Sequence, residues 1–292
     1  MVEKMSYKIF ADYGKGKDLD NFVIYFNPKR HEFDKRIYEL LEREWENIVE
    51  QARKKGKTLY NESLLNFDDV KDCNDITLIK TSPVEFREYV ATRNLLDQQE
   101  KYDKKITKRL ENKINPLSSF PAVLLDDYFI MGIKGKQVEK GSGALSFPGA
   151  GYLSVEKDTI EIEGNRIAKH PSSIVKREIK EELNISSDEI KNIKAIAIAK
   201  DCYKGSHWNT AIFSFVETDL TEDDIKRKWN IAQDTWEHEK LIFVPKENKY
   251  IESILSGEIP YSMRNKIKGK IPEKVSLTGK AKLMLKYFAN IF

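Results

Sequence analysis

One stretch of nine residues crowds three carboxylates together, in the order Arg177-Glu178-Ile179-Lys180-Glu181-Glu182-Leu183-Asn184-Ile185. Glu178 precedes Glu181 and Glu182 by three and four positions, so the three side chains are neighbours if the stretch is helical. Like charges at this spacing repel by about 0.2–0.5 kcal/mol per pair. A hard cation such as Mg²⁺ relieves the repulsion and bridges carboxylates to substrate phosphates. The spacing predicts a metal-phosphate site; the alternative is a solvated helix face with weak surface ion pairs.

The flanking residues predict a strand, a loop and a helix that would hold these acids. An apolar strand end at Ser146 and Phe147 is followed by Gly149 and Gly151, which allow the backbone to approach a ligand. A helix is expected to begin near Pro171, with a serine as its cap. The buried ridge of this helix is predicted at spacings of four, by Val175, Ile179 and Leu183.

The stretch resembles the second half of the Nudix signature, Arg-Glu-apolar-any-Glu-Glu-any-Gly-apolar, with Asn184 in place of its glycine. Asparagine tolerates the left-handed conformation at a helix end. The first half of the signature departs more, because its register puts Lys169 at the position of its first Glu and Glu163 at that of its Gly. If Gly151 is the counterpart of that glycine, it lies 26 residues before Arg177 instead of 14, which implies an insertion of 12 residues; the charged run at 156–165 is the expected place for it.

The insertion leaves the first Glu of the signature unassigned, and the candidates for it are Glu156, Glu161 and Glu163.

The resemblance extends upstream to the animal Nudix enzymes that act on UDP-glucose and UDP-galactose. Residues 81–94, Thr-Ser-Pro-Val-Glu-Phe-Arg-Glu-Tyr-Val-Ala-Thr-Arg-Asn, are similar to a Thr-Ser-any-Tyr-Arg-Asp-Phe-Leu-Gly-Thr-Asn stretch there, and residues 59–61 to an upstream Leu-Phe-Asn. The same enzymes carry an Arg-Gln-Val motif followed by Val-Pro-Gly, which residues 136–138 and 147–149 resemble. They also carry an Ile-Ala-Arg-Asn motif, which residues 198–201 resemble. The resemblance implies a UDP-sugar substrate.

The resemblance and the chemistry of diphosphates together imply roles for the acids. Glu178, Glu181 and Glu182 are expected to bind Mg²⁺, with Mn²⁺ as a possible substitute, and one of them, such as Glu181, can instead orient or deprotonate the attacking water. Arg177 is expected to hold an acid of the signature in place by a bidentate pair. The alternative for Arg177 is a surface pair with Glu181.

Weaker candidates surround this set. Glu237 and Glu239 precede an expected strand, where the resemblance implies a loop acid that serves as a base or an extra metal ligand; an exposed charged loop is the alternative. The predicted catalytic residues are Glu181, Arg177 and Glu239. The predicted substrate contacts are Gly149, Gly151, Lys136 and Lys200, and Lys134 is a further candidate. In so lysine-rich a chain each lysine is alternatively a solvated side chain. Trp208, Tyr203 and Trp236 can stack a base or sugar, or can pack in a core.

Periodicity predicts two regions, an α+β region over residues 1–115 and a Nudix domain over 116–292. Expected strands cover 7–11, 22–26, 59–67, 76–79, 122–125, 128–131, 193–200, 210–216 and 241–244. Expected helices cover 33–54, a segment after Pro83, 222–229, 250–255 and 280–288, and residues 101–113 are expected to form a solvated helix or linker. The fold class expected is α/β, a Nudix α/β/α sandwich with a mixed sheet.

Composition narrows the alternatives. The chain has 292 residues, 50 basic against 47 acidic side chains and a net charge of +3, too balanced for general nucleic-acid binding. Without a signal-peptide core or a run of eighteen apolar residues, a cytoplasmic protein with no membrane partner is expected. The predicted activity is a Mg²⁺-dependent pyrophosphatase that converts a UDP-sugar to UMP and a sugar 1-phosphate. The alternatives are an ADP-ribose or dinucleotide pyrophosphatase and a sensor that binds a nucleotide without cleaving it.

Overall fold

The computed structural model describes residues 7–136, 142–203 and 205–292. Its main element is a seven-stranded mixed sheet. Along this sheet lie β1 (Tyr7–Asp18), β10 (Ile190–Asp201), β11 (Thr210–Thr218), β5 (Leu117–Leu124), β6 (Tyr128–Lys134) and β12 (His238–Pro245), and β7 (Leu145–Ser146) pairs with β6. Only β11 and β5 run parallel; the other neighbours are antiparallel. The sheet confirms the predicted α/β class.

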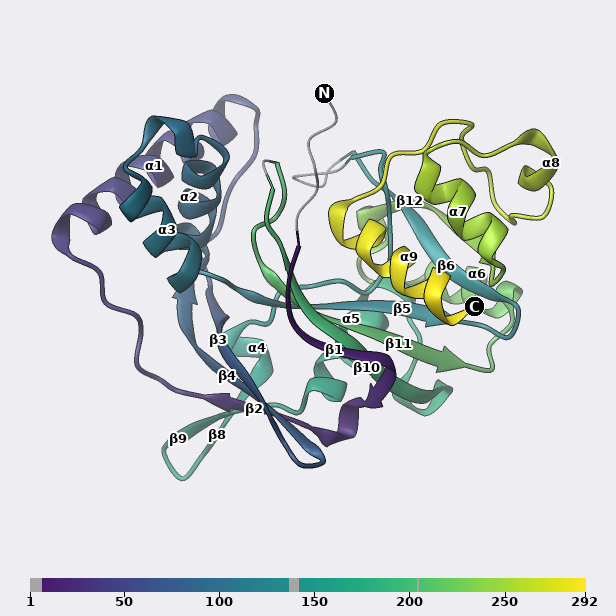
Figure 1. Ribbon diagram of the computed structural model, residues 1–292, viewed down its shortest axis with the longest axis horizontal. Coiled ribbons are helices and arrows are strands. Elements are labelled where there is room, and N and C mark those ends of the chain that lie inside the picture. Colours follow the sequence, from purple (N-terminus) through teal and green to yellow (C-terminus); the bar gives the residue numbers. More distant parts are fainter. Residues whose placement is uncertain (1–6, 137–141, 204) are drawn as a thin grey trace.

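Helices cover both faces of this sheet. On one face, α5 (Pro171–Leu183) and α6 (Glu222–Trp229) share an apolar cluster with alternate residues of β5, β10 and β11. On the other, α7 (Asn248–Ser256) and α9 (Gly279–Ile291) pack on the opposite residues of the same strands, with Phe288 wholly buried at their centre. The short α8 (Tyr261–Arg264) lies beyond α7, at the right edge of Figure 1. Within the described residues, no helix is long and apolar enough to span a membrane.

The N-terminal residues form a second, smaller layer. A three-stranded sheet has the order β2 (Phe22–Phe26), β4 (Ile76–Glu85) and β3 (Ser63–Cys73). Beside it gather α1 (Lys35–Lys54), α2 (Phe86–Asp97) and α3 (Lys104–Lys113), at the opposite end of the molecule from α7 to α9 (Figure 1). The first strand, β1, instead pairs with β10 at the edge of the large sheet. Phe22, Ile24 and Leu65 of the small sheet share the apolar cluster of α5, which is therefore enclosed between the two sheets.

Many strands and helices are longer than the sequence predicts, and three elements of the N-terminal region differ in ways that have a physical reason. The strand expected at 59–67 begins at Ser63, because Tyr60 and its neighbours stay exposed. Residues 101–113 contain a helix, α3, that buries Thr107 and Leu110. β4 extends through Pro83, which has no N–H; β2 pairs with β4 only over Thr77–Thr81, so no hydrogen bond to β2 is required from Pro83.

The helix that carries the acids ends as predicted and begins with a different cap. Pro171 is its first residue, and Asn184 ends it in the left-handed conformation with φ of 55°. The cap is His170, whose side chain accepts a hydrogen bond from the Ser172 backbone, and not a serine. The expected insertion is a hairpin of β8 (Thr159–Ile162) and β9 (Asn165–Ala168), preceded by the one-turn helix α4 (Val155–Asp158).

Candidate functional site

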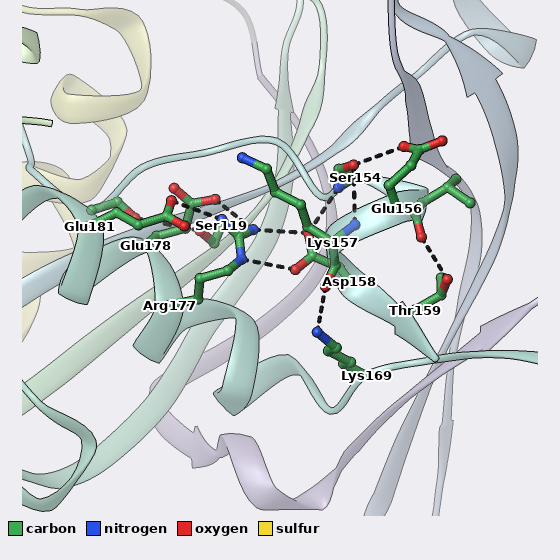
Figure 2. Close-up of polar contacts among 12 residues, drawn as sticks. Ser119, Ser154, Glu156, Lys157, Asp158, Thr159, Lys169, Arg177, Glu178 and Glu181 are labelled. Atoms are coloured by element: carbon green, nitrogen blue, oxygen red, sulfur yellow. Dashed lines mark hydrogen bonds and ion pairs between the residues drawn. The ribbon is translucent and has the colours of Figure 1, made fainter. Parts of the chain in front are cut away.

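Arg177 lies midway along α5 and binds three carboxylates at once (Figure 2). Its Nε and one terminal nitrogen donate to the two oxygens of Asp158 at 3.0 and 2.9 Å. The other terminal nitrogen donates to Glu181 Oε2 at 3.0 Å, and Glu178 Oε1 lies 2.8 Å from the guanidinium. The predicted bidentate pair is thus present, together with the i,i+4 pair with Glu181. Its acid, however, is Asp158, which lies outside the helix.

Asp158 is the site residue that the sequence did not reveal. Its side chain is 1% exposed and also accepts a hydrogen bond from the Ser154 backbone at 2.8 Å, which closes the turn of α4. On the far side of α4, the Lys169 backbone donates to the Asp158 carbonyl at 2.7 Å, so the two ends of the inserted hairpin meet here. The hairpin separates Asp158 from Arg177 along the chain and leaves them in contact in space.

The three acids considered for this position lie elsewhere. Glu156 is exposed on α4 and accepts a hydrogen bond from Ser154 Oγ at 3.1 Å. Glu161 and Glu163 are exposed in the hairpin, Glu163 at its turn with φ of 50°. No sequence signal singles out Asp158, because it lies inside the charged run at 156–165; its burial at the end of α4 distinguishes it from these three acids.

Glu178 is buried against the glycine loop. A Cβ on Gly151 would lie 2.2 Å from both Glu178 oxygens, so only glycine leaves room for this carboxylate. Burial raises the pKa of Glu178 to about 8; the charge of Arg177 opposes this rise, and Glu182, Glu181 and Asp158 add to it. Gly149, with φ of 87°, similarly lies so close to α5 that a Cβ would come within 2.9 Å of Ile179. Both predicted glycines therefore place backbone directly against α5.

Glu182 lies one turn further along α5 and is only 3% exposed. Burial raises its pKa to about 8, against hydrogen bonds from the backbone of Gly149 and Ala150 and the charge of Lys134, which favour the ionised form. Its Oε2 accepts no hydrogen bond from the described part of the chain. The nearest basic group to that oxygen is His238 Nδ1 at 3.4 Å. Glu182 is thus a buried acid whose environment lacks a full counter-charge.

The loop before β12 closes over these acids. The backbone of Asp234 donates to the Glu181 carbonyl at 3.0 Å, and that of Gly135 donates to the Glu237 carbonyl at 2.8 Å, which fixes the 3₁₀ turn Thr235–Glu237 against α5 and β6. Burial and the charge of Glu182 raise the pKa of Glu237 to about 7. His238 is 4% exposed, and burial, with Lys134 nearby, lowers its pKa to about 4, so this imidazole is neutral near pH 7.

Of the other residues predicted to act in the site, some line a cavity near it and one lies elsewhere in the fold. Glu239 is exposed at the start of β12, on the rim of a cavity, whereas its neighbour Glu237 turns toward Glu182. Lys136 is exposed on the same rim. Lys200 is 2% exposed and donates to the Glu111 carbonyl at 2.8 Å, which joins β10 to α3. Residues 137 and 138, which carry part of the resemblance, lie outside the described residues.

The donor set suits a hard divalent cation without being a preformed cage. Among residues 7–136, 142–203 and 205–292, no three His, Cys, Asp or Glu groups already converge as a metal site. Glu178 and Glu181 are instead held by Arg177, and Glu182 stands apart. Mg²⁺ binds through one or two protein carboxylates and takes its other ligands from water and phosphates. The unpartnered Glu182 oxygen and the carboxylate of Glu178 against Gly151 therefore fit such an ion.

Comparison with known proteins adds no family to this picture. No family model matches the chain, and no curated protein matches it significantly.

Proposed function

We propose that this protein is a Mg²⁺-dependent hydrolase of the Nudix type that cleaves the pyrophosphate bond of a nucleoside diphosphate linked to a sugar. The observation that carries the proposal is the pair of acids on α5, Glu178 and Glu182, which are buried against the loop of Gly149 and Gly151. Burial raises the pKa of each to about 8, so a bound cation stabilises their ionised forms. Burying two acids in this way does not favour folding, because burial disfavours their charged forms, whereas a metal-phosphate site requires them.

Hydrolysis adds one water across the P–O–P bridge, breaks the bond from one phosphorus to the bridging oxygen, and releases a proton from the attacking water. Bound Mg²⁺ would screen the phosphate oxygens from that water and neutralise charge on the leaving phosphate. Glu237 is the group suited to take the proton, since a base with a pKa near 7 combines ionisation with proton affinity at neutral pH. Lys134, which lies close enough to act on both Glu182 and Glu237, supplies positive charge beside them.

Arg177 positions the acids. Two hydrogen bonds to Asp158 fix the plane of the guanidinium (Figure 2). The terminal nitrogen that donates to Asp158 Oδ2 also contacts Glu178, and the other terminal nitrogen holds Glu181. Lysine in its place would offer a single ammonium and lose the parallel bonds. Arg177 is accordingly a positioning residue for the carboxylates.

The preference for UDP-sugars rests on the upstream resemblance, and one contact supports it. Residues 81–94, which carry the resemblance, include the start of α2 and its residue Tyr89. The Tyr89 hydroxyl lies 2.9 Å from that of Tyr152, the residue that follows Gly151. This segment of the N-terminal region therefore reaches the loop that is expected to face the phosphates.

The test is a product assay across a panel of UDP-glucose, UDP-galactose, ADP-ribose and a dinucleoside diphosphate, with Mg²⁺ and with EDTA. The proposal expects UMP and sugar 1-phosphate in equal amounts from the UDP-sugars, only with the metal. Preferred cleavage of ADP-ribose or the dinucleotide would show that the protein is an ADP-ribose or dinucleotide pyrophosphatase instead. Binding of these nucleotides without any cleavage would show a sensor and refute the proposal.

A further inference from the structure

A cavity of about 540 Å³ is lined in part by His238, the neighbour of Glu182, and the chemistry described so far does not use its two tryptophans. Its walls are Trp229 at the end of α6, Trp236 in the loop before β12, and Asn230, Thr235 and His238, with Lys136 and Glu239 on the rim. His238 belongs to both places, since its Nδ1 is 3.4 Å from Glu182. The volume is in the range of small-molecule sites, about 300–1,000 Å³.

Trp236 is exposed and yet fixed in place. Its side chain is 49% exposed, while its Nε1 donates to Asp234 Oδ1 at 3.1 Å. The Asp234 backbone is bonded in turn to the Glu181 carbonyl, and the Trp236 carbonyl packs so closely on Gly135 that a Cβ there would lie 2.4 Å away. The indole is therefore held relative to α5 before any ligand arrives, as a preorganised stacking surface requires.

The polar groups of the cavity are available to a ligand. Neither Asn230 nor Thr235 makes a side-chain hydrogen bond within the part of the chain that the structure describes. The Asn230 amide offers a donor and an acceptor together, which is the pattern presented by the N3–H and O4 edge of uracil. Lys136 on the rim offers a cation for oxygen atoms of the ligand.

A second cavity, of about 440 Å³ between α1 and α2, lacks these features. Its charged groups are already paired, Arg30 with Glu88 at 2.8 Å and Arg87 with Glu42 at 3.3 Å. Trp45 lines it and provides a comparison residue of the same type.

We infer that the cavity beside Trp236 binds the nucleoside half of the substrate, with the base stacked on the Trp236 indole and the phosphates directed toward the acids of α5. The inference rests on the proposed function for its link to catalysis. Every base offers a planar π-face to the indole, and the Asn230 amide of the same cavity can pair with the edge of a base. Together these two contacts favour the nucleoside over the sugar. The cavity therefore selects for the nucleoside and leaves the sugar to the region of Gly151.

The test is binding of UMP and AMP, measured by equilibrium dialysis with Mg²⁺, to wild type, Trp236→Ala and Trp236→Phe. Loss of a base stack corresponds to roughly 5- to 150-fold weaker binding. Trp236→Ala should show a loss in this range, and Trp236→Phe, which keeps a ring, should recover part of it. Trp45→Ala, the same change in the other cavity, should bind as wild type does, and melting temperatures identify any variant that fails to fold.

Equal binding by wild type and Trp236→Ala, an equal loss in Trp45→Ala, or no nucleotide binding by wild type would overturn the inference. Unchanged UMP binding with a lower kcat/KM for UDP-glucose would assign the cavity to the sugar and also overturn it. The proposed function fails separately, if wild type binds UMP and releases none from UDP-glucose.

Discussion

Arg177 and Asp158 are 19 positions apart in the chain and form two hydrogen bonds of 2.9 and 3.0 Å. The two parallel hydrogen bonds make the pair bidentate. Asp158 is buried and Arg177 is 21% exposed, so the pair is also largely shielded from solvent. The inserted hairpin of β8 and β9 begins directly after Asp158 and ends just before α5. The pair therefore joins the two ends of the insertion and orients the side chain that holds Glu178 and Glu181.

Asp158→Asn should destabilise the protein, because it removes the charge of the buried carboxylate that forms two hydrogen bonds with the Arg177 guanidinium. The expected decrease in the free energy of unfolding is about 1–3 kcal/mol, measured by urea denaturation with an unchanged m value. Glu156→Gln, which neutralises an exposed acid on the same turn of helix, should stay within about 0.5 kcal/mol of wild type. An equal effect of the two substitutions would show that the pair has no special stabilising role.

Local sequence patterns predict the helices and strands of the site. They do not predict the contacts between residues on the two sides of the insertion. The helix at Glu222–Trp229 was predicted with its observed bounds, and Asn184 ends α5 in the predicted conformation, because caps and periodicity are properties of neighbouring residues. No local pattern connects Asp158 to Arg177, since their contact depends on how the hairpin folds back. Glu237, rather than Glu239, turns inward for a similar reason: bonds from Gly135 and to Glu181 set the path of the loop.

The metal-free protein should become less stable as pH rises from about 4.5 to about 8. Burial raises the pKa of Glu178 and Glu182 to about 8 in the folded state, so folding takes up protons in this window. The free energy of unfolding then falls as pH increases. Urea denaturation in EDTA at pH 5.5, 7 and 8.5 measures the slope, which Glu182→Gln should reduce. A slope that is zero or positive in wild type would contradict the burial of these acids.

Added Mg²⁺ should reverse that loss most strongly at high pH, because the ion competes with protons for the same carboxylates. The shift in melting temperature on adding Mg²⁺ should be larger at pH 8.5 than at pH 5.5, and smaller in Glu182→Gln than in wild type at pH 8.5. A shift of the same size at both pH values, or in both proteins, would place the metal elsewhere.

Gly151→Ala should impair metal binding more than folding. The added Cβ would lie 2.2 Å from the Glu178 carboxylate and must displace it. The Mg²⁺ concentration for half-maximal activity is expected to rise by about 10- to 100-fold, the range for displaced groups around a metal. Gly14→Ala serves as the comparison, because Gly14 has a positive φ and open space around it; it should lose about 1 kcal/mol of stability and keep its metal dependence.

His238→Phe should weaken the site while it preserves packing. The imidazole is buried beside Gly132, where a Cβ would lie 2.2 Å from the ring, and its Nδ1 faces Glu182. A phenyl ring fills similar space and removes the polar neighbour of Glu182, so Mg²⁺ affinity should fall by about 10-fold or more with little change in melting temperature. Unchanged affinity in a folded variant would exclude His238 from positioning Glu182.

The central claim, that the buried acids of α5 support metal-dependent pyrophosphate hydrolysis, is tested most directly by the turnover of UDP-glucose with Mg²⁺ in wild type, Glu182→Gln and Glu252→Gln. Glu252 is an exposed acid on α7, on the opposite face of the large sheet. Wild type and Glu252→Gln should release UMP at similar rates, and Glu182→Gln should lose about 10²-fold or more in kcat. Equal turnover by Glu182→Gln and wild type, or no turnover by folded wild type, would contradict the claim.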